Sequence, residues 1–440
     1  MKRINIIMMR LGQCFLIFFI YYVTAHCSFS ITPGSICDRI ENAPITELTS
    51  SSDPNEEKVY EDPGTIVVYH GFGCAQSDKP GTEDFIKVAQ SKEVARYAQA
   101  AVFLNGWNSK YLNGDKNVAG LATMIRNIRL EGGTLKWEAA GILSDDSFEN
   151  PYGWCYFYTV IAWNPARIDL LVDQKDGGCD THDPAEANFF FAKNEGTTTA
   201  LSTYPTIIQN IGLIGKKTVA IAPRGFGFTW GHDDTPGDHN LLQIGYHMEH
   251  AEIFNEKGKR YQKGLRGTTT SGADFSFVDK GYVSWEAHAI FKDDDGRRNY
   301  QFGEMVSALA GDDLGVIQPP FSILPIEDEG GILSTCVSGP GPLKTEELEI
   351  DNIPYEYAVP MLTGWELGYH CGDNNVEEIG MWIDKWSYQK DPGAAAGKLR
   401  YTLSSILRDK NGKPYFDSRH KVTVLGLKPV VAGVKPIQSD

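Results

Sequence analysis

The sequence predicts an all-β protein made of three related antiparallel β-sandwich repeats with a short N-terminal extension. Three observations support this prediction. A thirteen-residue signature occurs twice, and a ten-residue block that follows its first occurrence is repeated in a third region of the chain. Segments that alternate between apolar and polar residues fill each copy. Because an antiparallel sheet with one apolar face must bury that face against a second layer, alternating strands at this spacing favour sandwiches.

The signature lies at 106–118 and reads GWNSKYLNGDKNV. It returns at 364–376 as GWELGYHCGDNNV, with seven of thirteen positions identical. Agreement at one constant offset indicates an internal repeat, which is the first feature to test because missing it misreads the whole fold.

A third, more diverged copy lies between these two. The block WEAAGILSDD at 137–146 returns at 285–294 as WEAHAIFKDD, with six of ten positions identical. All three copies also carry Gly-Asp-x-Asn followed by Val or Leu. We therefore expect repeats at 94–179, 217–317 and 354–440, the second with enlarged loops.

Alternation of residue type defines the strands within each copy. At 134–139, Leu135 and Trp137 alternate with polar residues, and the segments 282–287 and 398–403 follow the same pattern. A period of two marks a strand with one face on a core. The segments 101–107, 118–130 and 154–163 also read as strands. We expect 180–216 and 318–354 to be linkers or packing segments between repeats.

The N-terminus resembles a secretory signal, predicted at 1–25. Lys2 and Arg3 precede an apolar run at about 11–22, and small residues follow. A single membrane anchor is the alternative, although the run is shorter than the roughly 20 residues that a span needs. The extension at 26–93 should hold one strand at 64–73, and a short helix or an irregular connection is expected at 83–99.

Charge and cysteine content narrow the classes of function. The net charge of −16 argues against a general binder of nucleic acid or anionic membranes. No integral membrane segment is expected once the signal is removed. Seven cysteines then remain, which in an oxidising compartment predicts up to three disulfides and one further thiol, with the pairing left open.

The repeated Gly-Asp-x-Asn turn has two interpretations. Its carboxylate and amide oxygens could contact a cation or a sugar. Alternatively, Asp and Asn bond local backbone N–H groups while Gly supplies a positive φ. Repetition in three copies whose other loops differ favours the structural interpretation.

The second copy offers two candidate sites. Its first enlarged loop is rich in potential ligands for a divalent metal, Ca or Zn, although no zinc signature spacing is met and a solvated acidic loop is the alternative. Its second loop has a local excess of cations that could receive an anionic partner such as a sulfated or sialylated glycan, or could simply be solvated. The metal candidates are His232, Asp233, Asp234, Asp238 and His239, and the binding candidates are Lys257, Lys259, Arg260, Lys263 and Arg266.

Three apparent catalytic motifs are discounted. The His70-Gly turn resembles an oxyanion-donor turn, but no Gly-x-Ser-x-Gly elbow occurs in the chain. Cys74 beside it is more readily a disulfide cysteine than a nucleophile. The segment 212–218, GLIGKKT, lacks the glycine spacing of a phosphate loop.

The sequence therefore predicts a secreted, non-enzymatic binding protein with no cofactor, which recognises a glycan or another cell-surface ligand through loops at the ends of its sandwiches. Tethered weak sites would gain avidity from the repeats. One alternative is a metal-dependent hydrolase with its site in the second copy. Another is a structural or toxin-assembly subunit, which implies a homo-oligomer.

Overall fold

The protein is all-β, as the sequence predicts. Every regular element in the described part of the computed structural model is a strand, and no helix there is long and apolar enough to cross a bilayer. The model describes residues 45–47, 56–77, 85–145, 150–174, 189–194, 202–209, 216–230, 240–254, 282–293, 300–320, 322–324, 343–369, 372, 374–410 and 416–430.

The strands vary from three to thirteen residues, and most of the central ones have eleven or more. They are β1 (Ile45–Glu47), β2 (Glu57–Asp62), β3 (Ile66–Gln76), β4 (Ile86–Glu93), β5 (Gln99–Tyr111), β6 (Gly120–Glu131), β7 (Thr134–Ser144), β8 (Tyr152–Trp163), β9 (Leu171–Asp173), β10 (Phe189–Asn194), β11 (Ser202–Gln209), β12 (Thr218–Trp230), β13 (Gln243–Phe254), β14 (Tyr282–Lys292), β15 (Tyr300–Gly311), β16 (Gly315–Ile317), β17 (Ser322–Leu324), β18 (Lys344–Ile353), β19 (Tyr357–Tyr369), β20 (Glu378–Gln389), β21 (Gly397–Arg408) and β22 (Phe416–Leu427).

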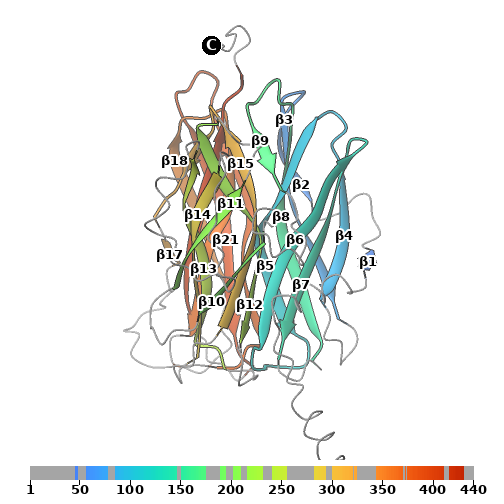
Figure 1. The fold of residues 1–440 in the computed structure, drawn as a ribbon, viewed down its shortest axis with the longest axis vertical. Helices are drawn as coiled ribbons and strands as arrows, with labels where there is room; N and C mark the ends of the chain where they lie inside the picture. The colour runs from blue at the N-terminus through green and yellow to red at the C-terminus, as the bar shows by residue number, and fades with distance from the viewer. Residues whose placement is uncertain are drawn as a thin grey trace, which may run out of the picture.

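Three sheets run roughly along the longest axis of the molecule (Figure 1). Sheet I has the order β1-β4-β7-β6-β12-β15-β10, with β9 also paired to β15. Sheet II has the order β11-β14-β13-β19-β22-β16, with β17 also paired to β22. Sheet III has the order β18-β21-β20-β5-β8-β3-β2. The described pairings are antiparallel apart from β1 with β4.

Each sheet joins strands from two of the three sequence segments. The predicted boundaries enclose the groups β5–β8, β12–β15 and β19–β22. However, the second strand of each group pairs with the first strand of another group: β6 with β12, β13 with β19, and β20 with β5. The segments therefore do not form three separate sandwiches. An apolar face that one segment cannot cover is covered by strands from the others.

The first strands of the three groups meet at an aromatic cluster, which we call the central triad. It consists of Trp107 in β5, Phe226 in β12 and Trp365 in β19. The ring centroids are 5.2 Å apart for Trp107 and Phe226, 5.1 Å for Trp107 and Trp365, and 4.9 Å for Phe226 and Trp365. All three side chains are buried in one continuous core that draws on every sheet.

Backbone hydrogen bonds join the Gly-Asp-x-Asn turns to one another. Lys116 and Val376 exchange two bonds, of 2.9 and 2.7 Å, and Leu241 and Asn374 exchange two more, of 2.8 and 2.9 Å. Gly372, like its counterpart in the first copy, has a positive φ. These contacts support the structural interpretation, because the turns tie the three segments together.

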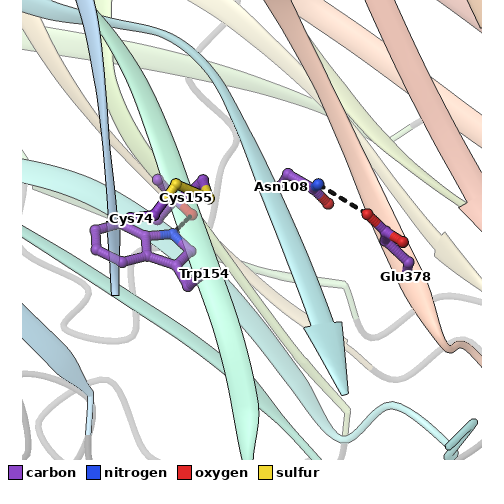
Figure 2. Close-up of a disulfide and its surroundings, with 6 residues drawn as sticks. Cys74, Asn108, Trp154, Cys155 and Glu378 are labelled. Atoms are coloured by element: carbon purple, nitrogen blue, oxygen red, sulfur yellow. Dashed lines mark hydrogen bonds between the residues drawn. A yellow bond between two sulfur atoms is a disulfide. The ribbon is translucent and has the colours of Figure 1, made fainter. Parts of the chain in front are cut away.

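One disulfide pairs Cys74 of β3 with Cys155 of β8 (Figure 2). The two residues face each other in the strand register. Cys74 is thus committed to a cross-link, which agrees with discounting it as a nucleophile. The other cysteines of the chain lie outside the described residues, so the prediction of up to three disulfides stays open beyond this one.

The N-terminal extension and the predicted linkers contain more strands than expected. The strand at 64–73 is confirmed as β3, but the short helix in 83–99 is wrong, because that segment forms β4 along β7. Burial of Ile86 and Val88 in the core outweighs the weak helical spacing. The segments 180–216 and 318–354 supply β10, β11, β17 and β18. Pro205 is tolerated in β11 because this strand is an edge of sheet II.

Candidate functional site

A β-bulge interrupts the first strand of each group just before a glycine. The register shifts fall between Leu104 and Gly106, between Pro223 and Gly225, and between Leu362 and Gly364. The bulged residues are buried and polar, and their side chains are held locally. Asn105 Oδ1 accepts a hydrogen bond from the backbone N–H of Leu362 at 3.1 Å. Arg224 Nε donates to the carbonyl of Val306 at 3.0 Å. The hydroxyls of Thr363 and Thr423 lie 2.7 Å apart.

Each of these glycines leaves space for side chains from neighbouring strands. A Cβ on Gly106 would overlap Trp382, one on Gly225 would overlap Met124, and one on Gly364 would overlap His247. In the register of each sheet, the fourth strand of the group places a further side chain beside the glycine. These residues are Phe157, Met305 and Lys421, respectively.

The chemistry at this shared position differs among the sheets. Sheet III has Phe157 stacked on Trp382, with centroids 5.1 Å apart and planes inclined by 10°, and sheet I has two methionines. Sheet II instead has His247 and Lys421. We call the face of each sheet that points away from the central triad its outer face. At this shared position, the outer face is polar in sheet II.

We call the outer face of sheet II around Gly364 the polar face. Its side chains come from four adjacent strands, β14, β13, β19 and β22. The rings of His247 and His288 are stacked, with centroids 4.6 Å apart and planes inclined by 13°. The polar face consists of Gln243, His247, His288, Glu366, Arg419 and Lys421, together with Gly245, Gly364 and Gly368.

Hydrogen bonds and charge pairing order one end of the polar face. Gln243 Nε2 donates to Glu366 Oε1 at 2.6 Å, and Arg419 Nη1 lies 3.6 Å from the same oxygen. A Cβ on Gly245 would lie 2.6 Å from the Cα of Glu366. The close approach of β13 and β19 at this glycine thus places fixed polar side chains side by side on the face.

Strand alternation places Lys421 on the outer side. Asp417 and Arg419 precede it at intervals of two and are exposed, whereas His420 faces the core. The Arg419 side chain is 48% exposed, but Lys421 is only 5% exposed. The polar face thus combines a solvent-facing cation with a buried one.

The site residues predicted from sequence lie outside the described residues. The metal candidates at 232–239 fall between β12 and β13 in the chain, and the basic candidates at 257–266 fall between β13 and β14. Both predictions stay untested. Within the described residues there is no group of three or more His, Cys, Asp or Glu side chains that could hold a metal ion.

The polar face was missed in the sequence because its members come from four strands that are far apart in the chain. One signal was available. The alignment that matches Thr159 with Thr423 also matches Phe157 with Lys421. A lysine at a position that is apolar in another copy marks a surface where the copies differ.

Two buried histidines serve the fold. His70 Nε2 donates to the carbonyl of Ile383 at 3.0 Å, and its Nδ1 lies 3.2 Å from Thr159 Oγ1, which suits a neutral ring. His420 is buried beside the core. Burial lowers the pKa of each histidine to about 4.

Acid should destabilise the protein through these two groups. Their folded pKa of about 4 lies below the ordinary 6.5, so the unfolded chain binds the extra protons between these values. The contribution of the two histidines to the free energy of unfolding is fully present above pH 6.5. It decreases as the pH falls to 4, by about 3 kcal/mol for each group. Urea unfolding at pH 7.5 and pH 4.5 measures the loss. His420→Gln should reduce the difference between the two pH values, and an unchanged difference would contradict this assignment.

Comparisons with known proteins give no relative. No protein-family model matches the sequence, and no curated protein or solved structure matches it.

Proposed function

We propose that this chain is a secreted, non-enzymatic binding protein that recognises a glycan through the polar face of sheet II. The observation that carries the proposal is the difference among the three outer faces at one shared position. Sheets I and III are apolar there, whereas sheet II has His247 and Lys421. Polar side chains at a position that packing would fill with apolar groups favour a role in recognition.

The geometry of the polar face suits sugar hydroxyls. The Gln243–Glu366 pair offers a fixed donor and acceptor system, and Arg419 adds further donors. The paired imidazole rings of His247 and His288 provide a flat surface beside these groups.

Secretion fits the same proposal. The N-terminal segment has the build of a signal, and a disulfide such as Cys74–Cys155 persists in an oxidising compartment. The strands that bear the polar face pair over long stretches with their neighbours. A rigid face of this kind loses little conformational freedom on binding, which favours affinity.

A glycan array with the purified protein tests the proposal, followed by titration of the best ligand into variants. Gln243→Ala should weaken binding about tenfold, because it removes a partner of the buried Glu366 carboxylate. The matched control is Asn108→Ala. Asn108 Nδ2 donates to Glu378 Oε1 at 2.9 Å in the corresponding register of sheet III (Figure 2).

The control variant should bind as the unaltered protein does. Silence across neutral, sulfated and sialylated glycans would overturn the proposal. Equal loss of affinity in Gln243→Ala and Asn108→Ala would also argue against the polar face as the site.

A further inference from the structure

We propose that sheet II binds a divalent transition-metal ion, with Zn²⁺ as the best fit, between the facing pairs His247–His288 and Glu249–Glu286 of β13 and β14. This inference goes beyond the proposed function, because binding of the metal requires no glycan. It concerns a different place from the segment 232–239, which was predicted from the sequence as a metal site and lies outside the described residues.

The first observation is the pair of histidines. His247 and His288 are directly opposite each other in the register of β13 and β14. Their rings lie face to face with centroids 4.6 Å apart, and both residues are partly exposed. Imidazole nitrogens bind zinc at about 2.0–2.1 Å. A modest rotation of the two rings would therefore place one nitrogen of each on a shared ion.

The second observation is the next pair along the same two strands. Glu249 faces Glu286, two residues from His247 and His288, so all four positions lie on the outer face. The register alone places the two glutamates, because their side chains lie outside the described part of the structure. Facing residues in an antiparallel pair have Cβ atoms about 4.5–5.5 Å apart, and successive residues on one face are about 7 Å apart. Two imidazoles and two carboxylates at these spacings can surround one ion above the sheet.

Sheet I has a matching strand pair, β6 and β7. Met124 there corresponds to His247, because each lies opposite the glycine that follows a bulge. Two residues further along, Arg126 faces Glu138, with Arg126 Nε 3.7 Å from Glu138 Oε2. Sheet I thus sets a cation against a carboxylate at the position where sheet II has two facing glutamates.

Two facing carboxylates destabilise a strand pair, because like charges directly opposite each other repel. Sheet III has Lys385 and Thr402 at the corresponding place, so it also avoids this arrangement. A divalent ion bound in sheet II would supply the positive charge that Arg126 supplies in sheet I.

The residue types define the class of ion. Zn²⁺ and its first-row neighbours bind imidazole together with carboxylate, whereas Ca²⁺ and Mg²⁺ take oxygen ligands. Two histidines beside two glutamates therefore favour Zn²⁺ over Ca²⁺.

Titration calorimetry of the full-length protein with Zn²⁺ alone, after removal of metal with a chelator, tests the inference. We expect one Zn²⁺ per chain to bind at these residues with a Kd of about 10 μM or lower. Saturating Zn²⁺ should also raise the thermal midpoint by about 2 °C or more, because the ion binds the folded chain. Ca²⁺ should bind at least about tenfold more weakly.

Glu249→Arg is the most informative variant, because it copies the arrangement of sheet I. It should weaken Zn²⁺ binding at least about tenfold and keep the thermal midpoint of the metal-free protein, since the new cation faces Glu286. His288→Gln should weaken binding to a similar extent. The matched control is Glu138→Gln, which removes the corresponding carboxylate of sheet I. It should bind Zn²⁺ as the unaltered protein does.

Absence of Zn²⁺ binding would overturn the inference. Binding that persists unchanged in both Glu249→Arg and His288→Gln would also overturn it, because the ion would then lie elsewhere in the chain. Neither measurement uses a glycan, so failure here is distinct from failure of the proposed function.

Discussion

Trp365→Ala is expected to lower the free energy of unfolding by about 3–5 kcal/mol and to weaken all three sheets together. Trp365 contacts both other members of the central triad, and it also packs edge-on against Tyr246 of sheet II. Removing the indole leaves a cavity where strands from all three sequence segments meet. Chemical unfolding followed by far-UV circular dichroism measures the loss.

Trp365→Phe is the matched control for this prediction. It keeps an aromatic ring, and Phe226 already occupies the corresponding place in β12. The expected loss is below about 2 kcal/mol. Equal stability of Trp365→Ala and Trp365→Phe would show that the triad does not join the sheets.

Gly106→Ala is expected to destabilise the protein by about 3 kcal/mol or more. Gly106 has a φ of +143°, which side-chain-bearing residues rarely adopt. A Cβ there would overlap the Cα of Trp382 and would lie 2.6 Å from the carbonyl oxygen of Met381. Backbone atoms cannot rotate away, so β5 and β20 would have to separate. The thermal midpoint measures the effect.

Gly153→Ala provides the control for this substitution. Gly153 also lies in a strand of sheet III, but the nearest atom to its added Cβ is Leu112 Cδ2 at 3.6 Å, an ordinary contact. We expect a change within about 0.5 kcal/mol. A Gly106→Ala protein with the thermal midpoint of Gly153→Ala would contradict the close approach of β5 and β20.

Local patterns in the sequence were sufficient to predict several strands within the three copies and the strand that precedes them. Leu135, Trp137 and Ala139 alternate with partly exposed residues in β7, as the period of two requires. The segment 64–73 was also recognisable, because its β-branched run ends in a glycine-rich turn. These features depend on neighbours in the chain, so they can be read without knowing which strands pair.

Long-range pairing could not be predicted in the same way. Nothing local to β20 indicates that Met381 lies opposite Trp107, more than 250 residues earlier. The choice of partner depends on which apolar faces remain uncovered once each hairpin has formed. β4 was not predicted as a strand for the same reason, because it forms by pairing with β7.

The polar face depends both on local residue patterns and on long-range strand pairing. Lys421 and His247 can each be read as unusual residues in a strand, but only the register brings them to opposite sides of Gly364. Bulges also shift that register, and their position is not encoded by alternation. The loop residues that composition highlighted lie outside the described residues.

Differential scanning calorimetry of the full chain tests the central claim most directly, namely that three sequence segments share one core through exchanged strands. We predict a single cooperative transition whose calorimetric and van't Hoff enthalpies agree, because no segment can keep its sheet when another unfolds. Separate transitions for 94–179, 217–317 and 354–440, each surviving the loss of the others, would contradict it.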